Sequence, residues 1–522
     1  MASQSKRVAI IGAGPSGLAA IKECLAAGLT VQCFEKAHAL GGQWLYDPAP
    51  TAGTHSSIYS GVILNSSRAT SGFSDFPIDP ARYPIYYSHK LHLRYLNEYA
   101  ARFGLEKHVR YNTSVVGCAP RADGGWEVRV RGGGGGGGDS GSDDKEEVLA
   151  FDAVVSGTGF AGTPAIPEYE GRDRFKGEVL HSHYYRIPSA FEGKKVVVVG
   201  LGSSAADIAC EVAPLAKELT IVSRRGGWIL PRFVLGKPAE AWDSRAGQTW
   251  LPASVQEYLF QVIVGHAAGK MPAELQADHG ITSQAVTLRG DFVEKLRTGV
   301  FTLRRSTVAS FTETGVLLAD GTAVDADAVI LATGYRAVDQ PHLPPGVLAS
   351  RDAPAPHVDL YKMVVPPRCK DLYVLGQTEL AGPANAVVEA QARFVAAVVA
   401  GRARLPGEEE MMRDIRALRR WRAAHVVDSE RHTVWVEYVR YVDSLLEPLG
   451  AVPSFRRLLG RVFSSGRPLR ALRVLSAVVF GFAAPAQWRL FGEGSGAELA
   501  EETLLRTGAG ADELSEGEKG FL

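Results

Sequence analysis

The sequence predicts an α/β fold with two Rossmann-like dinucleotide-binding domains, the second inserted in the first, and a mostly helical C-terminal extension. A strand-like run, a glycine-rich turn and a helix-like run occur in that order twice, with the turns at residues 12–17 and 200–205. Two further segments, 151–160 and 326–335, each place an Asp before an apolar strand and a Thr-Gly-aromatic turn after it. A chain of 522 residues is long enough for about three units of ordinary size.

The composition is that of a soluble globular protein, with 46% hydrophobic and 22% charged residues. The 57 Lys and Arg balance the 57 Asp and Glu, which argues against a nucleic-acid partner because such proteins normally carry a basic excess. Five cysteines without a CxxC pair disfavour a disulfide framework, a zinc ribbon and a dithiol redox centre. No secretion signal precedes the first glycine motif, and the longest uncharged apolar stretch, 474–487, is too short to span a bilayer. We therefore expect a cytoplasmic protein.

The first unit begins with the strand Arg7–Ile11, continues through GAGPSG and a helix-like segment, and reaches a second strand, Thr30–Phe34, that is followed by Glu35. Glycines in such a turn let the backbone approach a pyrophosphate at the helix N-terminus, and Glu35 can accept a hydrogen bond from a ribose hydroxyl. The pattern predicts a dinucleotide site formed by Gly12, Ala13, Gly14, Pro15, Ser16, Gly17, Glu35 and Lys36.

The second unit repeats this order, with the strand Lys195–Val199, the turn GLGSSA and a helix-like segment. Its second strand ends at Ser223, Arg224 and Arg225, where the first unit has an acid. An acid would repel a ribose 2′-phosphate and an arginine can bind it through two hydrogen bonds, so this site is predicted to take NADPH and the first to hold FAD. The predicted NADPH contacts are Gly200, Gly202, Ser203, Ser204, Asp207 and Arg224.

The two Asp-strand-Thr-Gly segments are expected to mark where the chain leaves and re-enters the first domain, by analogy with nested two-dinucleotide folds. Seven consecutive glycines, 132–138, predict a mobile hairpin loop between two strands. The expected divisions are the first part of the FAD domain (1–163), the NADPH domain (164–313), the second part of the FAD domain (314–450) and the C-terminal extension (451–522).

The segment FKGEVLHSHYY, just ahead of the second glycine motif, resembles the FxGxxxHxxx(Y/F) identifying sequence of flavin-containing monooxygenases, with Phe175, Gly177, His181 and Tyr185 at its fixed positions. Baeyer-Villiger monooxygenases are similar but carry Trp at the last position, so Tyr185 favours the N- and S-oxygenating branch. The resemblance covers nearly the whole chain, through GGQW (41–44), LNSS (64–67), FSDFP (73–77), ATGY (332–335), EAQAR (389–393), RHTVWVEYVRYVDSL (431–445) and QWRLFG (487–492), the last two typical of animal-type members.

The resemblance implies which side chains contact the cofactors. GGQW resembles a flavin-contacting GGLW, with Gln43 in place of Leu, and the Asn of LNSS lies between flavin and nicotinamide in the family. Asn65 is therefore the implied catalytic residue, a hydrogen-bond donor near the flavin peroxide, while Ser204 and Asp207 place NADP+. The other implied cofactor contacts are Gly42, Gln43, Trp44, Leu64, Ser66, Thr333 and Gly334.

The resemblance also implies the reaction. NADPH reduces FAD, NADP+ stays bound, and O2 adds to the reduced flavin to give a hydroperoxide that oxygenates a soft N or S atom of a small molecule. Two alternatives stay open, which are Baeyer-Villiger oxygenation of ketones and an uncoupled NADPH oxidase or redox sensor. A flavin disulfide reductase would need a CxxC motif, which the chain lacks. His181 and His183 lack accompanying ligand-spaced acids or cysteines, so we expect structural histidines that link the two domains, and no metal site.

The C-terminal region is uneven in charge. Residues 454–473 hold six arginines and no acids among Phe, Leu and Val, as in a basic interfacial segment, whereas residues 492–522 hold eight acids against two bases. Two interpretations of 454–473 stay open: peripheral contact with a membrane such as the endoplasmic reticulum, or a solvated or intramolecular surface. Animal-type members usually end in a hydrophobic membrane helix, and this sequence ends in GADELSEGEKGFL. A homodimer is also left open.

Overall fold

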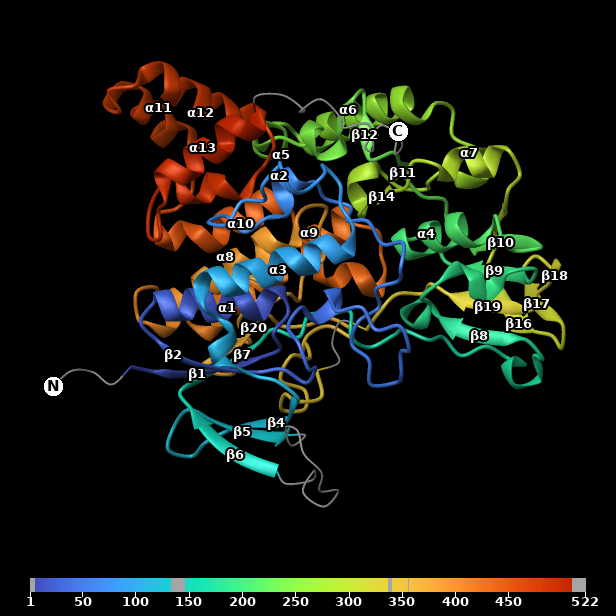
Figure 1. Ribbon diagram of the computed structural model, residues 1–522, viewed down its shortest axis with the longest axis horizontal. Helices are drawn as coiled ribbons and strands as arrows, with labels where there is room; N and C mark the ends of the chain where they lie inside the picture. Colours follow the sequence, from blue (N-terminus) through green and yellow to red (C-terminus); the bar gives the residue numbers. More distant parts are fainter. Residues whose placement is uncertain (1–4, 133–145, 337–339, 355, 509–522) are drawn as a thin grey trace.

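The computed structural model describes residues 5–132, 146–336, 340–354 and 356–508, and two parallel five-stranded sheets organise them (Figure 1). The first sheet has the order β20-β7-β1-β2-β3. Its strands are β1 (Arg7–Ile11), β2 (Thr30–Phe34), β3 (Val109–Arg110), β7 (Ala153–Ser156) and β20 (Leu372–Val374). The central strands are apolar runs because helices cover the sheet. α1 (Pro15–Ala26) packs against α8 (Ala384–Val399) and α3 (His89–Phe103).

The second sheet has the order β15-β10-β9-β19-β8 and is also parallel throughout. Its strands are β8 (Glu178–His181), β9 (Lys195–Val199), β10 (Glu218–Ser223), β15 (Thr302–Arg305) and β19 (Ala328–Leu331). α4 (Ser203–Val212) connects β9 to β10, so β9, α4 and β10 repeat the arrangement of β1, α1 and β2. The two predicted strand-turn-helix units are confirmed.

The second sheet is inserted in the first, because all of its strands lie between β7 and β20 in the chain. The predicted point of re-entry is wrong. Segment 326–335 contains β19, which pairs with β9 and β8 in the centre of the second sheet, and the chain returns to the first sheet only at β20. The expected division after residue 313 thus separates strands of one sheet. The strands of both Asp-strand-Thr-Gly segments occupy equivalent places, since each pairs with the strand that leads into the glycine turn of its own sheet, β7 with β1 and β19 with β9.

Two antiparallel three-stranded sheets accompany the parallel ones. β4 (Thr113–Pro120), β5 (Trp126–Gly132) and β6 (Glu146–Phe151) form one of them, and β16 (Val308–Phe311), β17 (Gly315–Leu318) and β18 (Ala323–Asp325) form the other. β5 and β6 pair with Arg131 opposite Glu146, which confirms the predicted hairpin strands. The glycine-rich loop predicted between them lies, from residue 133 on, outside the described residues.

Between β10 and β15 the chain makes a long excursion, residues 226–301, with short strands and three helices. The strands are β11 (Ile229–Leu230), β12 (Phe233–Val234), β13 (Lys237–Pro238) and β14 (Thr287–Leu288). The helices are α5 (Arg245–Trp250), α6 (Ala253–Ala268) and α7 (Phe292–Arg297), and the 3-10 helix η6 (Ala239–Trp242) precedes them.

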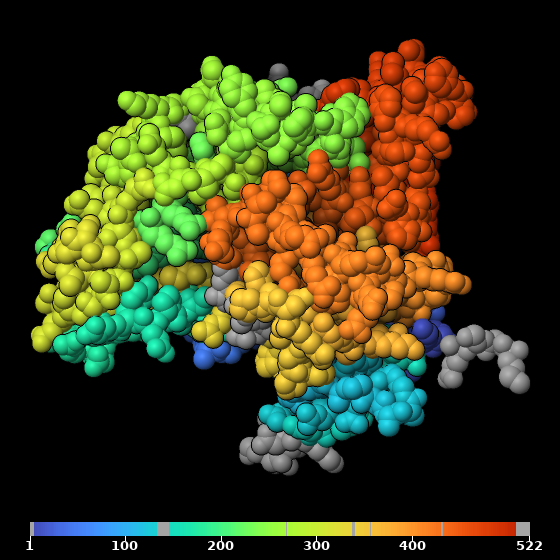
Figure 2. Space-filling view, turned by 180° about the vertical axis from the view of Figure 1, so that it is seen from behind, coloured from blue at the N-terminus to red at the C-terminus, as the bar shows by residue number. Residues whose placement is uncertain are grey.

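The chain after β20 is mostly helical, as predicted. It contains α8, α9 (Glu408–His425), α10 (Tyr438–Leu446), α11 (Phe455–Ser464), α12 (Pro468–Phe480), η11 (Pro485–Arg489) and α13 (Ala497–Gly508). α11, α12 and much of the excursion lie along the upper side of the molecule in both views (Figures 1 and 2). Within the described residues, none of the helices combines the length and the apolar character needed to cross a bilayer.

Candidate functional site

The first glycine turn leaves no room for side chains where β1 ends and α1 begins. A Cβ on Gly17 would lie 1.8 Å from the Gly12 carbonyl oxygen, and a Cβ on Gly42 would lie 2.9 Å from the Cα of Gly14. Gly12 has φ +92°, a conformation that favours glycine. α1 begins after Gly14 with Pro15, and no side chain caps it. The first N–H groups of α1 are therefore left for an anion, so the turn fits the pyrophosphate of FAD.

Glu35 follows β2 and is buried beside this turn. Its two carboxylate oxygens accept hydrogen bonds from the N–H groups of Ala13 (2.7 Å) and Ala37 (2.8 Å). Each oxygen keeps a second lone pair, so the carboxylate can also accept from a ribose hydroxyl, as predicted. The Lys36 ammonium instead donates to the Gly53 carbonyl oxygen at 3.0 Å.

The GGQW segment forms the 3-10 helix η1 (Gly42–Trp44) against the glycine turn. The Gly41 N–H donates to the Ala13 carbonyl oxygen at 3.0 Å, and the Gln43 side chain is hydrogen-bonded to Ser57. The Trp44 ring lies 4.3 Å from the ring of His92, centroid to centroid. Burial lowers the pKa of His92 to about 3, so this ring is neutral and supports Trp44 by packing alone.

The second glycine turn repeats this geometry. A Cβ on Gly200 would lie 2.4 Å from the Ala332 carbonyl oxygen, and α4 begins after Gly202 without a side-chain cap. Ser203 and Ser204 are half-buried in the first turn of α4, and neither hydroxyl has a hydrogen-bond partner in the described part of the chain. These groups are free to bind a phosphate.

Arg224 follows β10, is exposed, and makes no ion pair or side-chain hydrogen bond within residues 5–132, 146–336, 340–354 and 356–508. Its position at the end of the second strand fits a ribose 2′-phosphate. Asp207 is predicted to contact NADP+, but in the structure it binds protein side chains. The Tyr59 hydroxyl donates to one of its oxygens (2.7 Å) and Arg289 to the other (3.2 Å), so Asp207 primarily joins the two units, and its contact with NADP+ stays a prediction.

Thr333 and Gly334 lie just after β19 and bind the connection between the sheets. The Thr333 hydroxyl donates to the Ala165 carbonyl oxygen at 2.6 Å, and the Gly334 carbonyl oxygen accepts from the Ala165 N–H at 2.9 Å. A role of these two residues at a cofactor stays a prediction.

The segment that contains Asn65 lies along the boundary between the two units. Asn65 is exposed, and its Oδ1 accepts from Arg232 Nη2 at 3.2 Å. Its amide nitrogen has no protein partner among the described residues. Leu64 is buried, and the Ser66 and Ser71 hydroxyls are 2.7 Å apart. The structure therefore leaves a free N–H donor at Asn65, as the predicted role requires.

The FxGxxxHxxxY segment forms β8 and the turn after it. The side chains of Phe175, His181 and Tyr185 are buried, and the Tyr185 hydroxyl donates to Glu211 at 3.0 Å. Burial lowers the pKa of His181 to about 4, so it is neutral near pH 7. His183 Nε2 lies 2.9 Å from the Thr54 carbonyl oxygen of the first unit. His183 therefore joins the two units, as expected, whereas the contacts of the His181 ring are with the His183 N–H and the Tyr335 ring.

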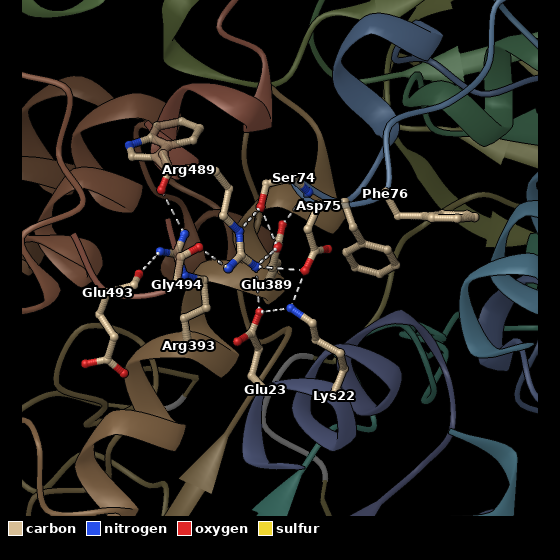
Figure 3. Close-up of polar contacts among 12 residues, drawn as sticks. Lys22, Glu23, Ser74, Asp75, Phe76, Glu389, Arg393, Arg489, Glu493 and Gly494 are labelled. Atoms are coloured by element: carbon tan, nitrogen blue, oxygen red, sulfur yellow. Dashed lines mark hydrogen bonds and ion pairs between the residues drawn. The ribbon is translucent and has the colours of Figure 1, made fainter. Parts of the chain in front are cut away.

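Three of the other motifs meet in one buried charge network (Figure 3). The Arg489 guanidinium, from QWRLFG, is 2.7 Å from Glu23 of α1 and 2.6 Å from Glu389 of EAQAR, and it also contacts Asp75 of FSDFP at 3.2 Å. Lys22 pairs with Glu23 and Asp75. Burial alone would raise the pKa of Glu23, but the nearby positive charges outweigh it and lower this pKa to about 2. The network anchors the C-terminal region to the body of α1.

Sequence reasoning missed Gly157, Gly376 and Arg232. A Cβ on Gly157 would lie 3.1 Å from the Gly17 nitrogen, and one on Gly376 would lie 2.7 Å from the Ser16 hydroxyl oxygen. Gly157 follows β7, which is next to β1 in the sheet, and Gly376 comes shortly after β20, which is next to β7. The order of strands in the sheet, and not the spacing along the chain, therefore brings both glycines close to the first glycine turn. Gly157 lies in the segment 151–160 already noted, whereas no motif marked Gly376 or Arg232.

The chain matches the model of the flavin-binding monooxygenase-like family over residues 5–507. It is 34% identical over 511 residues to flavin-containing monooxygenase 5 of Cavia porcellus, with 94% of this chain and 89% of that protein covered. Among solved structures, S-allyl-L-cysteine S-oxygenase from Allium sativum has a TM-score of 0.63 and 27% identity, covering 89% of this chain and 94% of that one. Cyclohexanone monooxygenase from Rhodococcus bound to NADP+ has a TM-score of 0.61, 18% identity and coverages of 85% and 97%, a likeness in fold alone.

Proposed function

The chain belongs to the family of flavin-containing monooxygenases and uses FAD and NADPH, and from this premise we propose that it transfers one oxygen atom from O2 to a soft nitrogen or sulfur atom of a small molecule. The observation that carries this proposal is the pair of uncapped glycine turns, one beside Glu35 and one beside Arg224, with Asn65 between the two units. The resemblance to an S-oxygenase supports the choice of sulfur among the substrates.

FAD, once reduced by NADPH, supplies the electrons that activate O2. The chain's own residues bind the two cofactors and orient them. The N-terminus of α1 would hold the FAD pyrophosphate, and Glu35 would accept from its ribose. Arg224 and the N-terminus of α4 would hold the phosphates of NADPH. Asn65 would present its N–H donor to the bound cofactors, and Trp44 would help to exclude water from them.

Ketone oxygenation is the alternative, because the fold is shared with a cyclohexanone monooxygenase. Tyr185, the residue that favours N- and S-oxygenation, is only 1% exposed and hydrogen-bonded to Glu211. It supports the proposal through family resemblance and does not itself act on a substrate.

The test is product analysis with purified holoenzyme, NADPH and 18O2. The probes are a dialkyl thioether, a tertiary amine and a cyclic ketone. We expect a sulfoxide or an N-oxide that carries one 18O atom, with close to one product per NADPH. An ester from the ketone, without sulfoxide or N-oxide, would replace the proposal by Baeyer-Villiger oxygenation. Hydrogen peroxide as the sole product would replace it by an NADPH oxidase.

We further propose that the α11–α12 hairpin contacts an anionic membrane surface. Both helices bury one face and expose large apolar side chains on the other, including Phe463 (82% exposed) and Leu469 (76%). Three of the six arginines predicted to be interfacial bind other protein groups, whereas Arg456, Arg467 and Arg473 are exposed and make no side-chain hydrogen bond within the described residues. Apolar side chains beside free arginines are the pattern of an interfacial helix. The large exposed apolar residues of the two helices are Phe455, Leu459, Phe463, Leu469, Leu472 and Phe480. Trp250 of α5, also exposed, lies beside Phe455 and Phe480.

Sedimentation with vesicles tests the hairpin. We expect the protein to bind phosphatidylserine vesicles at low salt and to bind phosphatidylcholine vesicles weakly. Phe463→Ser combined with Leu469→Ser should weaken binding about tenfold or more, because each large apolar side chain contributes roughly 1.5–3 kcal/mol when buried. Leu235→Ser, at a residue of the excursion that is 61% exposed, should leave binding unchanged. Absence of binding to anionic vesicles contradicts the proposal, as does a change of molecular mass in the double variant, which would identify a homodimer interface. A location at the endoplasmic reticulum stays a prediction.

A further inference from the structure

Arg232 holds three successive residues of the turn that presents Asn65. It lies between β11 and β12 in the excursion, and its Nη2 donates to the Ile63 carbonyl oxygen and to Asn65 Oδ1, both at 3.2 Å. Its Nε donates to the Leu64 carbonyl oxygen at 3.4 Å. An arginine has only donors, so the oxygen of the Asn65 amide must face it, and the amide nitrogen is directed away from it.

Glu240, in η6 of the same excursion, holds the other side of the turn. It accepts from the Ser67 N–H at 2.5 Å and from the Thr70 hydroxyl at 3.1 Å. The Tyr86 hydroxyl connects the two holding residues, since it lies 2.8 Å from both the Arg232 carbonyl oxygen and Glu240 Oε2. The turn at residues 65–66 is thus fixed on both sides by one short stretch of the inserted unit.

Burial of the Arg232 guanidinium is energetically unfavourable. Arg232 is only 8% exposed, yet its side chain forms no ion pair with a carboxylate within the described residues. Its hydrogen-bond acceptors are two carbonyl oxygens and one amide oxygen, and the Tyr86 ring lies 6.0 Å away. Buried guanidinium groups are normally paired with an acid, because burial of an unpaired charge is unfavourable. The arrangement favours a role in orienting the turn.

We propose that Arg232 and Glu240 are positioning residues that fix the Asn65 amide with its N–H donor toward the bound cofactors, an inference that rests on the proposed function. Both residues belong to the excursion from the NADPH-binding sheet, whereas Asn65 belongs to the first unit. Correct orientation of the donor then depends on the packing of the excursion against the turn. Neither residue is a catalytic residue, since each acts through Asn65.

A double-mutant cycle tests the proposal in the holoenzyme. The variants are Arg232→Met, Asn65→Ala and the combination of the two. Each single variant should lower the rate of oxygenation about tenfold to hundredfold, with more of the NADPH electrons released as hydrogen peroxide, because a misplaced donor stabilises the reaction poorly. The combined variant should be within about twofold of Asn65→Ala, since Arg232 has no further effect when its target is absent. FAD content and KM for NADPH should stay close to wild type.

Two further variants separate positioning from stability. Glu240→Gln loses the charge of a half-buried residue and should produce a smaller increase in peroxide. The same is expected of Arg232→Lys, which keeps the charge and its donors on a single nitrogen but loses the planar fork. Arg245→Met removes another buried arginine, one that pairs with Asp443 and Gln487, and it should leave the peroxide fraction unchanged. Effects of Arg232→Met and Asn65→Ala that multiply in the combined variant contradict the proposal, as does an equal rise in peroxide with Arg245→Met.

The proposed function can fail separately. In that case the wild type forms no oxygenated product from any probe, and the cycle is scored on the rate of NADPH oxidation and on the visible circular dichroism of the bound flavin. A combined variant that matches Asn65→Ala in both measurements would still support the positioning role.

Discussion

Replacement of Arg489 by methionine is expected to destabilise the protein by about 3–5 kcal/mol, because it leaves a cluster of buried carboxylates without its central cation. Glu23, Asp75 and Glu389 offer carboxylate oxygens that all lie within 4.8 Å of one another. Arg489 contacts all three and is 4% exposed, so water cannot replace it. Glu23 lies on α1, and we therefore also expect weaker retention of FAD. Chemical denaturation followed by circular dichroism, together with release of flavin fluorescence, measures both effects.

The matched control is Arg402→Met, which removes an ion pair with Glu493 whose side chains are 42% and 41% exposed. Exposed pairs contribute about 0–1 kcal/mol, so the denaturation midpoint should hardly change. Arg489→Lys keeps the charge but cannot reach all of the partners, and an intermediate loss is expected. Equal losses of unfolding free energy in the Arg489 and Arg402 variants would show that the buried network contributes no more to stability than an exposed ion pair.

Gly17→Ala should strongly weaken FAD binding. The added Cβ would lie 1.8 Å from the Gly12 carbonyl oxygen, so β1 and α1 would have to separate, and overpacking of this kind costs roughly 3 kcal/mol or more. A loss of that size lowers affinity at least about a hundredfold. The second unit carries Ala205 at the corresponding position, fully buried, so its turn accommodates a Cβ there. The ratio of flavin to protein absorbance measures the result.

Gly265→Ala is the control for this variant. Gly265 lies within α6 with no atom within 4 Å of the position of a Cβ, so alanine should be tolerated and should stabilise the helix by about 0.5–1 kcal/mol. A Gly17→Ala protein that still contains one FAD per chain would mean that the first turn does not hold the pyrophosphate.

Local patterns predicted the two nucleotide-binding units well, because each consists of neighbours in the chain. The turn at Gly12, the acid at Glu35 and the basic end of β10 all follow from spacing along one strand-turn-helix unit. The order of strands in the sheets could not be predicted from spacing along the chain. β19 has the composition of a strand that fits either sheet, and only its pairing with β9 and β8 places it in the second.

The site depends on contacts that the spacing of residues does not reveal. Asn65 was identified by family resemblance, but Arg232, which orients it, is 167 positions away and belongs to a stretch without a motif. Arg489 and Glu23 are 466 positions apart. The sequence presents three separate motifs, FSDFP, EAQAR and QWRLFG. Only the structure shows that their charged residues neutralise one another in a single cluster (Figure 3).

The insertion of the second sheet also determines the order in which the protein can fold during synthesis. The strands of the second sheet, from β8 to β19, are contiguous in the chain, so that sheet can be completed as soon as residue 331 has left the ribosome. The first sheet must wait for β20, and its helix α1 must wait longer still, for α8 and Arg489. The first sheet is therefore completed after the second, although four of its five strands are synthesised before it, and the nascent chain carries an open sheet edge at β7 until β20 is made.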